Sequence, residues 1–278
     1  MTAAKHSGRN GFLERTTASF VDAMEHAFYA EQTARADGLL QRLDARVKLV
    51  GILALIVSAA AVHRLAVIGG LFAIAVVLAA LSRVSFNVLL KRVWIAVLLF
   101  TGVIALPAPF ITPGQVVAQV PWLGWTVTSQ GLTSAGYLVL RVETAATLCV
   151  LLVLTTPWNH VLKALRVLRV PAVLVTILGM TYRYLFLVLQ SAHDMFESRR
   201  SRMVGELTGS ERRRVAASSA GVLMSKTFDL SSEVYLAMQS RGYRGDVSLL
   251  DEFQVRRFDW IMLAGFALIS AAAFWLGR

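Results

Sequence analysis

The chain has 278 residues, of which 56% are hydrophobic and only 16% are charged, and its formal net charge is +11. This composition is too apolar for a soluble globular domain and predicts an all-α integral membrane protein. The basic residues lie between apolar runs rather than on one face with interleaved aromatic residues, which excludes nucleic acid as the expected partner and favours a cytoplasmic membrane face.

Residues 1–45 predict a polar N-terminal segment on the cytoplasmic side of the bilayer. Within it, Phe12, Phe20, Met24 and Phe28 recur at helical spacing among acidic residues, which indicates a short amphipathic helix lying on a surface. The segment shows no signal-peptide pattern, so we expect the mature protein to keep it.

Residues 46–156 predict four transmembrane spans. The apolar run from Leu49 to Leu81 is broken only at His63 and Arg64, and it suffices for two spans joined by a tight hairpin, since about 20 residues of helix cross the hydrocarbon core. Residues 93–106 predict a third span, which nearby prolines end, and residues 131–155 predict a fourth.

The charged residues between these runs predict the orientation. Arg46 and Lys48 precede the first span, and we expect them on the cytoplasmic side with the other basic flanks. No charged residue lies between Arg92 and Arg141, so we expect that stretch outside, anchored by its aromatic residues. The fourth span itself carries Arg141 and Glu143, which we interpret as a structural pair or a polar contact between helices rather than an ion pathway.

Residues 157–257 predict a cytoplasmic coupling domain of long helices inserted before the last span. The apolar run Val170 to Leu189 is long enough to cross, but six arginines follow it and would then lie outside, against the positive-inside rule. We therefore expect one long cytoplasmic helix over residues 171–203, a polar turn, and a second helix over residues 211–240. Residues 258–278 predict the fifth span, with its basic end inside.

Both long helices are predicted to end in an arginine with small or flexible neighbours. The second ends in Ser240-Arg241-Gly242, which physically is either an ordinary helix end capped by glycine or an arginine that projects toward another protein. The first ends in Ser201-Arg202-Met203, with Ser198-Arg199-Arg200 as the alternative.

The sequence predicts neither an ATPase nor a metal site in this chain. A glycine-rich phosphate loop ending in Gly-Lys-Ser or Gly-Lys-Thr does not occur in it, so ATP hydrolysis would fall to another subunit. Cys149, the only cysteine, lies in an apolar run, and the histidines lack the spacing of a metal site. These histidines are His6, His26, His63, His160 and His193.

Three stretches resemble the transmembrane coupling subunit, or T component, of energy-coupling factor transporters, a branch of the ABC importers. They are residues 43–49, LDARVKL, residues 180–186, MTYRYLF, and residues 233–245, EVYLAMQSRGYRG. The likeness extends over nearly the whole chain from about Leu39, and the wording of the motifs is most similar to the cobalt and nickel subtype, CbiQ.

The resemblance implies that the two arginine triplets lie at the tips of two crossing helices and bind grooves of two cytoplasmic ATPase subunits, identical or related. The triplets are then Ser201-Arg202-Met203, where Met203 departs from the usual glycine, and Ser240-Arg241-Gly242. A substrate-binding membrane subunit, with or without a small accessory membrane subunit, would complete the complex.

The implied protein is a non-catalytic subunit of the inner (plasma) membrane without a cofactor, and its N-terminus and coupling domain are cytoplasmic. It would transmit ATP-driven motion to the substrate-binding subunit for uptake of cobalt ions. Nickel or a vitamin are alternative substrates. A self-sufficient membrane transporter or a membrane enzyme are rival functions, but the chain shows neither internal repeats nor converging acids, histidines or nucleophiles.

Overall fold

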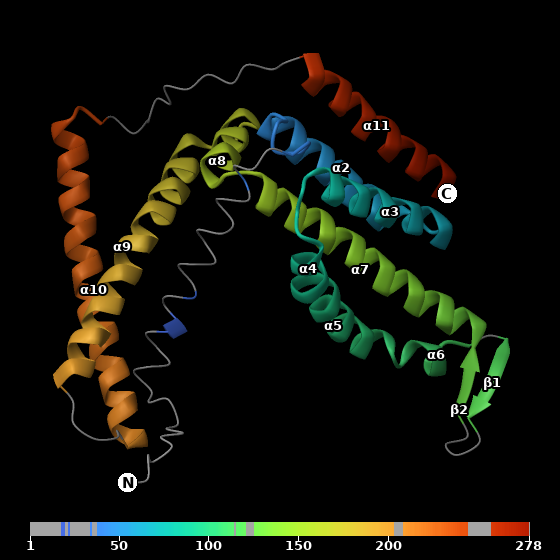
Figure 1. Ribbon diagram of the computed structural model, residues 1–278, viewed down its shortest axis with the longest axis horizontal. Coiled ribbons are helices and arrows are strands. Elements are labelled where there is room, and N and C mark those ends of the chain that lie inside the picture. The colour runs from blue at the N-terminus through green and yellow to red at the C-terminus, as the bar shows by residue number, and fades with distance from the viewer. Residues whose placement is uncertain are drawn as a thin grey trace, which may run out of the picture. The chain divides into compact units, whose positions relative to one another are not determined.

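The protein is almost entirely helical in its computed structural model, which confirms the predicted all-α membrane class (Figure 1). The structure describes residues 18, 19, 22, 34, 38–113, 115–120, 125–202, 208–243 and 257–277. The chain divides into two compact units. We call residues 30–167 with 251–278 the membrane unit, and residues 1–29 with 168–250 the hairpin unit.

The helices of the membrane unit follow the apolar runs of the sequence. They are α2 (Ala45–Ala61), α3 (Leu65–Leu81), α4 (Phe86–Leu89), the π-helical turn η1 (Leu90–Trp94), α5 (Ile95–Ala105), α6 (Ala108–Ile111), α7 (Ser129–Thr155), α8 (Trp158–Val167) and α11 (Arg257–Gly277). The stretch predicted to lie outside also contains a small antiparallel hairpin of β1 (Val116–Val120) and β2 (Trp125–Thr128), which the sequence analysis did not predict.

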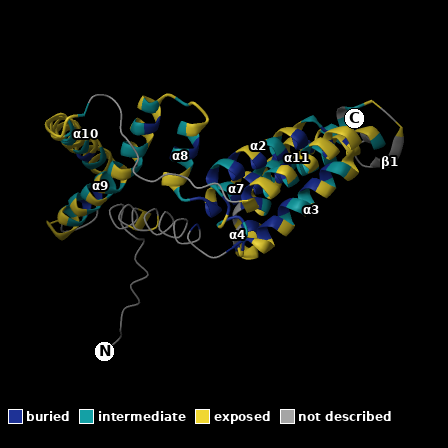
Figure 2. Cartoon of the chain, turned by 90° about the horizontal axis from the view of Figure 1, so that it is seen from above, coloured by how far each residue is buried: buried dark blue, intermediate teal, exposed yellow. Residues whose placement is uncertain are grey.

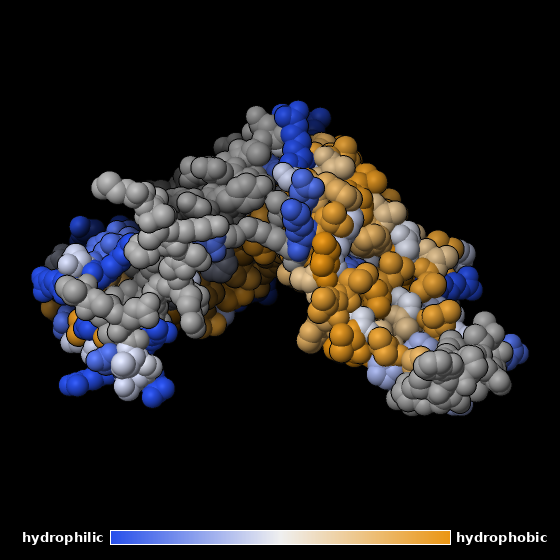
Figure 3. All heavy atoms as spheres, turned by 60° about the horizontal axis from the view of Figure 1, so that its bottom comes forward, coloured by the Kyte–Doolittle hydropathy of each residue, from blue (hydrophilic) through white to orange (hydrophobic). Residues whose placement is uncertain are grey.

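The membrane unit has a shared apolar core and an apolar exterior. Its core packs α2 and α3 against α7 and α11, with Ile52, Ile68, Leu151 and Phe266 among the buried side chains (Figure 2). The face of this unit that Figure 3 shows is largely hydrophobic as well. Trp275, for example, is 81% exposed. A surface of this kind belongs in lipid rather than in water.

The close approach of α2 and α11 depends on a glycine. A Cβ atom placed on Gly51 of α2 would overlap the ring of Phe266 on α11. Small residues allow helix backbones to approach closely in membranes, where packing replaces the hydrophobic effect as the driving force. Gly51 therefore sets the distance between the first and the last helix of the membrane unit.

The tight turn between α2 and α3 is held by polar groups of α7. Arg141 Nη2 donates a hydrogen bond of 2.8 Å to the carbonyl oxygen of Val62, and the Tyr137 hydroxyl donates to the carbonyl oxygen of His63. Arg141 thus makes the interhelical polar contact expected of it. Its partner is a turn carbonyl and not Glu143, whose two buried carboxylate oxygens have no hydrogen-bond partner within the described residues.

Lys48, which the sequence places in a basic flank before the first span, has a buried side chain. The side chain is only 2% exposed, and its Nζ donates a 2.8 Å hydrogen bond to the carbonyl oxygen of Thr155, the last residue of α7. The last carbonyls of a helix have no partner within the helix, and the negative end of the helix dipole favours a cation there. Lys48 therefore ties α2 to the end of α7.

The residue that begins α2 adds a second tie. The Asp44 carboxylate accepts a 2.8 Å hydrogen bond from the backbone N–H of Arg46 and so caps the helix. The backbone N–H of Asp44 donates a 2.9 Å hydrogen bond to the carboxylate of Asp259 on α11. The LDARVKL motif therefore joins three helices at one end of the membrane unit.

Two long helices make up the described part of the hairpin unit, α9 (Ala172–Arg202) and α10 (Gly209–Ser240). Their bounds confirm the helices expected over residues 171–203 and 211–240. By length and composition α9 could itself cross a membrane, as could α7 and α11, while α3 and the stretch Ile95–Phe110 are shorter apolar helices. The cytoplasmic location of α9 stays a prediction of the charge distribution.

We predict that Gly51→Leu lowers the apparent unfolding temperature in detergent. Forcing a side chain into a closely packed contact costs about 1–3 kcal/mol, here at the contact between α2 and α11. The matched control is Gly70→Leu, because Gly70 lies on α3 with open space around its position. Equal unfolding temperatures for the two variants would show that Gly51 does not set this contact.

We also predict that a cysteine replacing the exposed Gln190 of α9 is protected from a membrane-impermeant maleimide added outside cells. The background is Cys149→Ser, so that no other thiol is present. A cysteine replacing Gln115, which is exposed in the stretch predicted to lie outside, should be labelled in parallel. Labelling at position 190 from outside would mean that α9 crosses the bilayer.

Candidate functional site

The two helices of the hairpin unit are joined side to side near the end of α9. Arg199 Nη2 donates a 3.2 Å hydrogen bond to the Ser218 hydroxyl on α10, and Ala192, Phe196 and Ser219 are buried in the same part of the unit. This junction sets how the two helix ends are presented.

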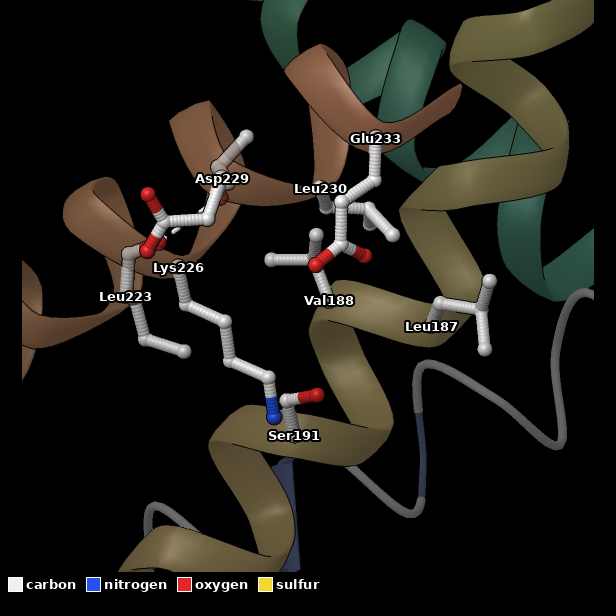
Figure 4. A pocket seen from close by; sticks show the side chains of 9 residues that line it. Leu187, Val188, Ser191, Leu223, Lys226, Asp229, Leu230 and Glu233 are labelled. Atoms are coloured by element: carbon white, nitrogen blue, oxygen red, sulfur yellow. Dashed lines mark hydrogen bonds between the residues drawn. The ribbon is translucent and has the colours of Figure 1, made fainter. Parts of the chain in front are cut away.

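A groove of about 330 Å³ lies between the helices beyond this junction. Its floor is apolar and its rim is charged, and Figure 4 shows Lys226 extending from α10 toward Ser191 of α9. The residues that line it are Leu187, Val188, Ser191, Leu223, Lys226, Thr227, Asp229, Leu230 and Glu233.

The end of α9 presents several arginines in different states. Arg199 is engaged with Ser218, and Arg200 forms an ion pair of 3.4 Å with Glu197. Arg202, in the last turn, is exposed and makes no hydrogen bond or ion pair with any described residue. Ser201 is exposed beside it, and Met203 lies outside the described residues. Of the two candidate triplets, only Ser201-Arg202-Met203 has a central arginine that makes no hydrogen bond or ion pair with the described residues.

The end of α10 is fixed by the backbone that follows it. The N–H of Gly242 donates to the carbonyl oxygen of Gln239 over 2.9 Å, and the N–H of Tyr243 donates to that of Met238 over 3.0 Å. Gly242 adopts the left-handed conformation with φ +81°, as predicted for a glycine cap. This pair of hydrogen bonds is a Schellman motif, and Arg241 is the C-cap residue of α10.

Arg241 is held by its backbone but not by its side chain. Arg241 is exposed, and its guanidinium makes no hydrogen bond or ion pair with the described part of the chain. Ser240 before it donates its hydroxyl to the carbonyl oxygen of Ala237 over 2.9 Å. The neighbours on both sides are small, so a partner surface can reach the guanidinium without steric hindrance.

The two exposed arginines lie at opposite ends of α10. Arg202 ends α9 just before the link into α10, whereas Arg241 follows the last turn of α10 (Figure 1). A helix of 32 residues is about 48 Å long at 1.5 Å per residue. The hairpin unit therefore carries one exposed arginine at each end of α10, Arg202 and Arg241, and we call these two positions the arginine tips.

The start of α10 is fixed by a capping box that the sequence analysis missed. The backbone N–H of Thr208 donates 2.8 Å to the Glu211 carboxylate, and the Thr208 hydroxyl accepts from the Glu211 N–H. The backbone and hydroxyl hydrogen bonds from Thr208 lower the pKa of Glu211. The signal was present in the sequence, as Thr followed three residues later by Glu.

This arrangement suits protein recognition better than chemistry. Each guanidinium offers five donors in a planar fork that matches carboxylates and carbonyl oxygens. No group of three or more His, Cys, Asp or Glu side chains that could hold a metal ion occurs within the described residues. The two exposed guanidinium groups, Arg202 and Arg241, are therefore candidates for contacts with another protein.

Comparison with known proteins identifies the relatives of the chain. The family described as cobalt transport protein, CbiQ, matches residues 37–250. A relative from Methanocaldococcus jannaschii, named uncharacterized protein MJ1571, is 32% identical over 94% of this chain and 91% of its own length.

Two further relatives carry functional names. The cobalt transport protein CbiQ of Rhodobacter capsulatus is 31% identical over 54% of this chain and 62% of its own length. The energy-coupling factor transporter transmembrane protein EcfT of Brevibacillus brevis is 30% identical over 61% of this chain and 67% of its own length.

The match to the Methanocaldococcus protein extends N-terminal to the family match. A match that began at residue 37 would cover at most 242 of the 278 residues, which is less than the 94% covered. Part of the predicted amphipathic segment therefore has a counterpart in that relative.

We predict that Thr208→Ala loosens the start of α10. Loss of an N-cap side chain should speed amide hydrogen exchange in the first turn roughly fivefold. The ionised Glu211 carboxylate accepts the hydrogen bond from the Thr208 N–H, and it is fully ionised above the usual pKa of glutamate. This contribution to the cap is lost as the pH falls through the lowered pKa of Glu211, so the exchange is measured near pH 7. Ser231→Ala, at an exposed position within α10, is the control and should leave the exchange unchanged.

Proposed function

The chain belongs to the CbiQ family of cobalt transport proteins, and from that premise we propose that it is the transmembrane coupling subunit of an energy-coupling factor ABC importer. The family match and the CbiQ and EcfT relatives support a transmembrane component of an energy-coupling factor transporter. The observation that supports the coupling role most is the pair of unengaged arginines at opposite ends of α10.

The proposed partners of these arginines are two cytoplasmic ATPase subunits, identical or related. One subunit would receive Arg202 with Ser201 and Met203, and the other would receive Arg241 with Ser240 and Gly242. Each guanidinium would donate charge-assisted hydrogen bonds to carboxylates or carbonyl oxygens in a groove of its ATPase. The engagement of Arg199 and Arg200 within the unit supports Arg202 as the first contact.

Rigid helices explain how such contacts could transmit motion. When ATP closes the two ATPases, the tips bound to them move relative to one another, and helices with fixed ends transmit that displacement as rigid bodies. The Schellman motif after Arg241 and the capping box before α10 fix the two ends of α10. We propose that the motion reaches a substrate-binding membrane subunit through the apolar first half of α9, where Leu174 and Ile177 are exposed.

The proposed substrate of the complex is the cobalt ion, bound by the substrate-binding subunit and not by this chain. The family match and the name of the Rhodobacter relative support cobalt, with nickel or a vitamin as alternatives. The subunit itself would be non-catalytic and would lie in the inner membrane, with the N-terminal segment and the hairpin unit on the cytoplasmic side.

We predict that the double variant Arg202→Glu/Arg241→Glu loses ATPase co-purification by at least tenfold. The reversed charges would repel the carboxylates that we expect in the ATPase grooves. Arg213→Glu, an equally charged change at an exposed position within α10, should retain the complex. Co-purification is measured by pull-down of the ATPases with the tagged subunit, and cobalt uptake into cells is measured in parallel.

An intact complex in the double variant would refute the proposed tips. Cobalt uptake by the purified subunit alone in liposomes would refute the coupling role and support a self-sufficient transporter. Replacing Arg199 and Arg202 singly by alanine assigns the first tip, with Ser218→Ala as the control that removes the Arg199–Ser218 hydrogen bond but keeps both arginines. Only the arginine that binds the ATPase should reduce co-purification by more than this control does.

A further inference from the structure

The turn that follows α3 has an arginine at a position where the backbone favours glycine. Arg83 has φ +53°, in the left-handed region, and its N–H donates to the carbonyl oxygen of Ala80 over 3.1 Å. The N–H of Val84 donates to the carbonyl oxygen of Ala79 over 3.2 Å. Glycine is the usual residue at the left-handed position of such a Schellman motif, because it has no Cβ. An arginine strains the backbone here, which indicates that its side chain has a role that glycine lacks.

The end of α3 does not need the Arg83 side chain as a cap. The carbonyl oxygen of Leu81 accepts a 3.2 Å hydrogen bond from the N–H of Leu39. The carbonyl oxygen of Ser82 accepts a 2.9 Å hydrogen bond from Nε2 of Gln41. Arg83 is exposed, and its guanidinium makes no hydrogen bond or ion pair with any described residue. The guanidinium is therefore available to an anion outside the chain.

A second cation without a partner follows eight residues later. Lys91 in η1 is exposed, and its ammonium group makes no hydrogen bond or ion pair within the described ranges. The sequence contains no acidic residue between Asp44 and Glu143, so neither cation has a carboxylate nearby in the chain. Both belong to a basic flank that the positive-inside rule assigns to the cytoplasmic face.

The π-helical turn aligns an exposed apolar row beside these cations. Four exposed residues follow one another at steps of four, five and four, and we call them the apolar row: Phe86, Leu90, Ile95 and Leu99. The step of five crosses η1, where the N–H of Ile95 donates to the carbonyl oxygen of Leu90, so the row stays on one face. The ring of Trp94 contacts that of Phe86 edge-to-face, with centroids 5.1 Å apart, and its Nε1 anchors the turn on α7.

Two cations next to an exposed apolar row match the chemistry of an anionic phospholipid. The phosphate of such a lipid needs cationic donors, and its acyl chains need an apolar surface. A soluble phosphate compound would use the cations but not the apolar row. A zwitterionic lipid would use the apolar row, but its own positive group would weaken its attraction to the cations.

We propose that Arg83 and Lys91 bind the phosphate of an anionic phospholipid of the cytoplasmic leaflet, with an acyl chain of that lipid lying along the apolar row. The π-helical turn keeps the acyl-chain surface continuous from α4 into α5, next to the two cations. The site lies wholly within the membrane unit and uses neither arginine tip, so it does not depend on the proposed coupling role.

Lipid retention by the purified full-length subunit tests this site. The protein in detergent is mixed with phosphatidylglycerol or with phosphatidylcholine of the same acyl chains, and lipid retained after gel filtration is quantified by mass spectrometry. Each cation near an anionic headgroup contributes about a factor of five, so the wild type should retain roughly tenfold more phosphatidylglycerol. Arg83→Gln/Lys91→Gln should lose this preference. The matched control, Arg213→Gln/Arg214→Gln, removes two exposed arginines from α10 and should keep it.

Arg83→Gly separates lipid binding from the stability of the turn. Glycine relieves the left-handed strain, so without added lipid this variant should unfold at a temperature no lower than that of the wild type. It should nevertheless retain about fivefold less phosphatidylglycerol. A lower unfolding temperature would mean that the arginine stabilises the end of α3, and the proposal would be wrong.

Other outcomes would also overturn the proposal. Equal retention of the two lipids by the wild type would exclude a site for an anionic headgroup, and equal losses in the two double variants would show that only total charge matters. Displacement of phosphatidylglycerol by equimolar glycerol phosphate would show that the cations take a free phosphate. Displacement by a co-expressed substrate-binding membrane subunit would show that the apolar row is a protein contact.

Discussion

The buried ammonium group of Lys48 is the interaction on which the architecture depends most. A buried charge is unfavourable unless it is paired or hydrogen-bonded, and here the carbonyl oxygen that ends α7 accepts a hydrogen bond from it. Because α8 follows α7 after only two residues and packs on α2 through Ala164 against Ala45 and Leu49, the same contact fixes where the chain leaves the membrane unit. The Lys48 contact and the packing of α8 on α2 thus hold the C-terminal end of α7 against α2.

Polar groups elsewhere in the membrane unit serve the same purpose. Arg141 and Tyr137 bind the carbonyl oxygens of the α2–α3 turn, and Trp94 Nε1 donates 3.1 Å to the Thr147 hydroxyl across to α7. Thr147 in turn donates to the Glu143 carbonyl oxygen of its own helix. Backbone and side-chain polar groups in a bilayer must be satisfied by the protein itself, and α7 supplies most of these partners.

Much of this structure could be predicted from the sequence, because long apolar runs and glycine or proline punctuation specify helices locally. The bounds of α9 and α10 and the left-handed Gly242 followed from such patterns. The role of Lys48 could not be predicted, because its partner carbonyl lies 107 residues away in the chain. From the sequence alone, a lysine before an apolar run indicates only a basic flank of a span. The small β-hairpin was missed for a similar reason, since tertiary context decides short strands. The engagement of Arg199 by Ser218 could be found only from the packing of two helices.

The left-handed turn at Gly242 has a consequence for how such a tip can change during evolution. Side chains with a Cβ are strained by roughly 1–2 kcal/mol in this conformation, so a substitution there weakens the turn that orients Arg241. The glycine has open space around it and needs no contact of its own. A lineage could therefore lose the tip while keeping its arginine, and a comparison that scored only the charged residue would overlook the loss.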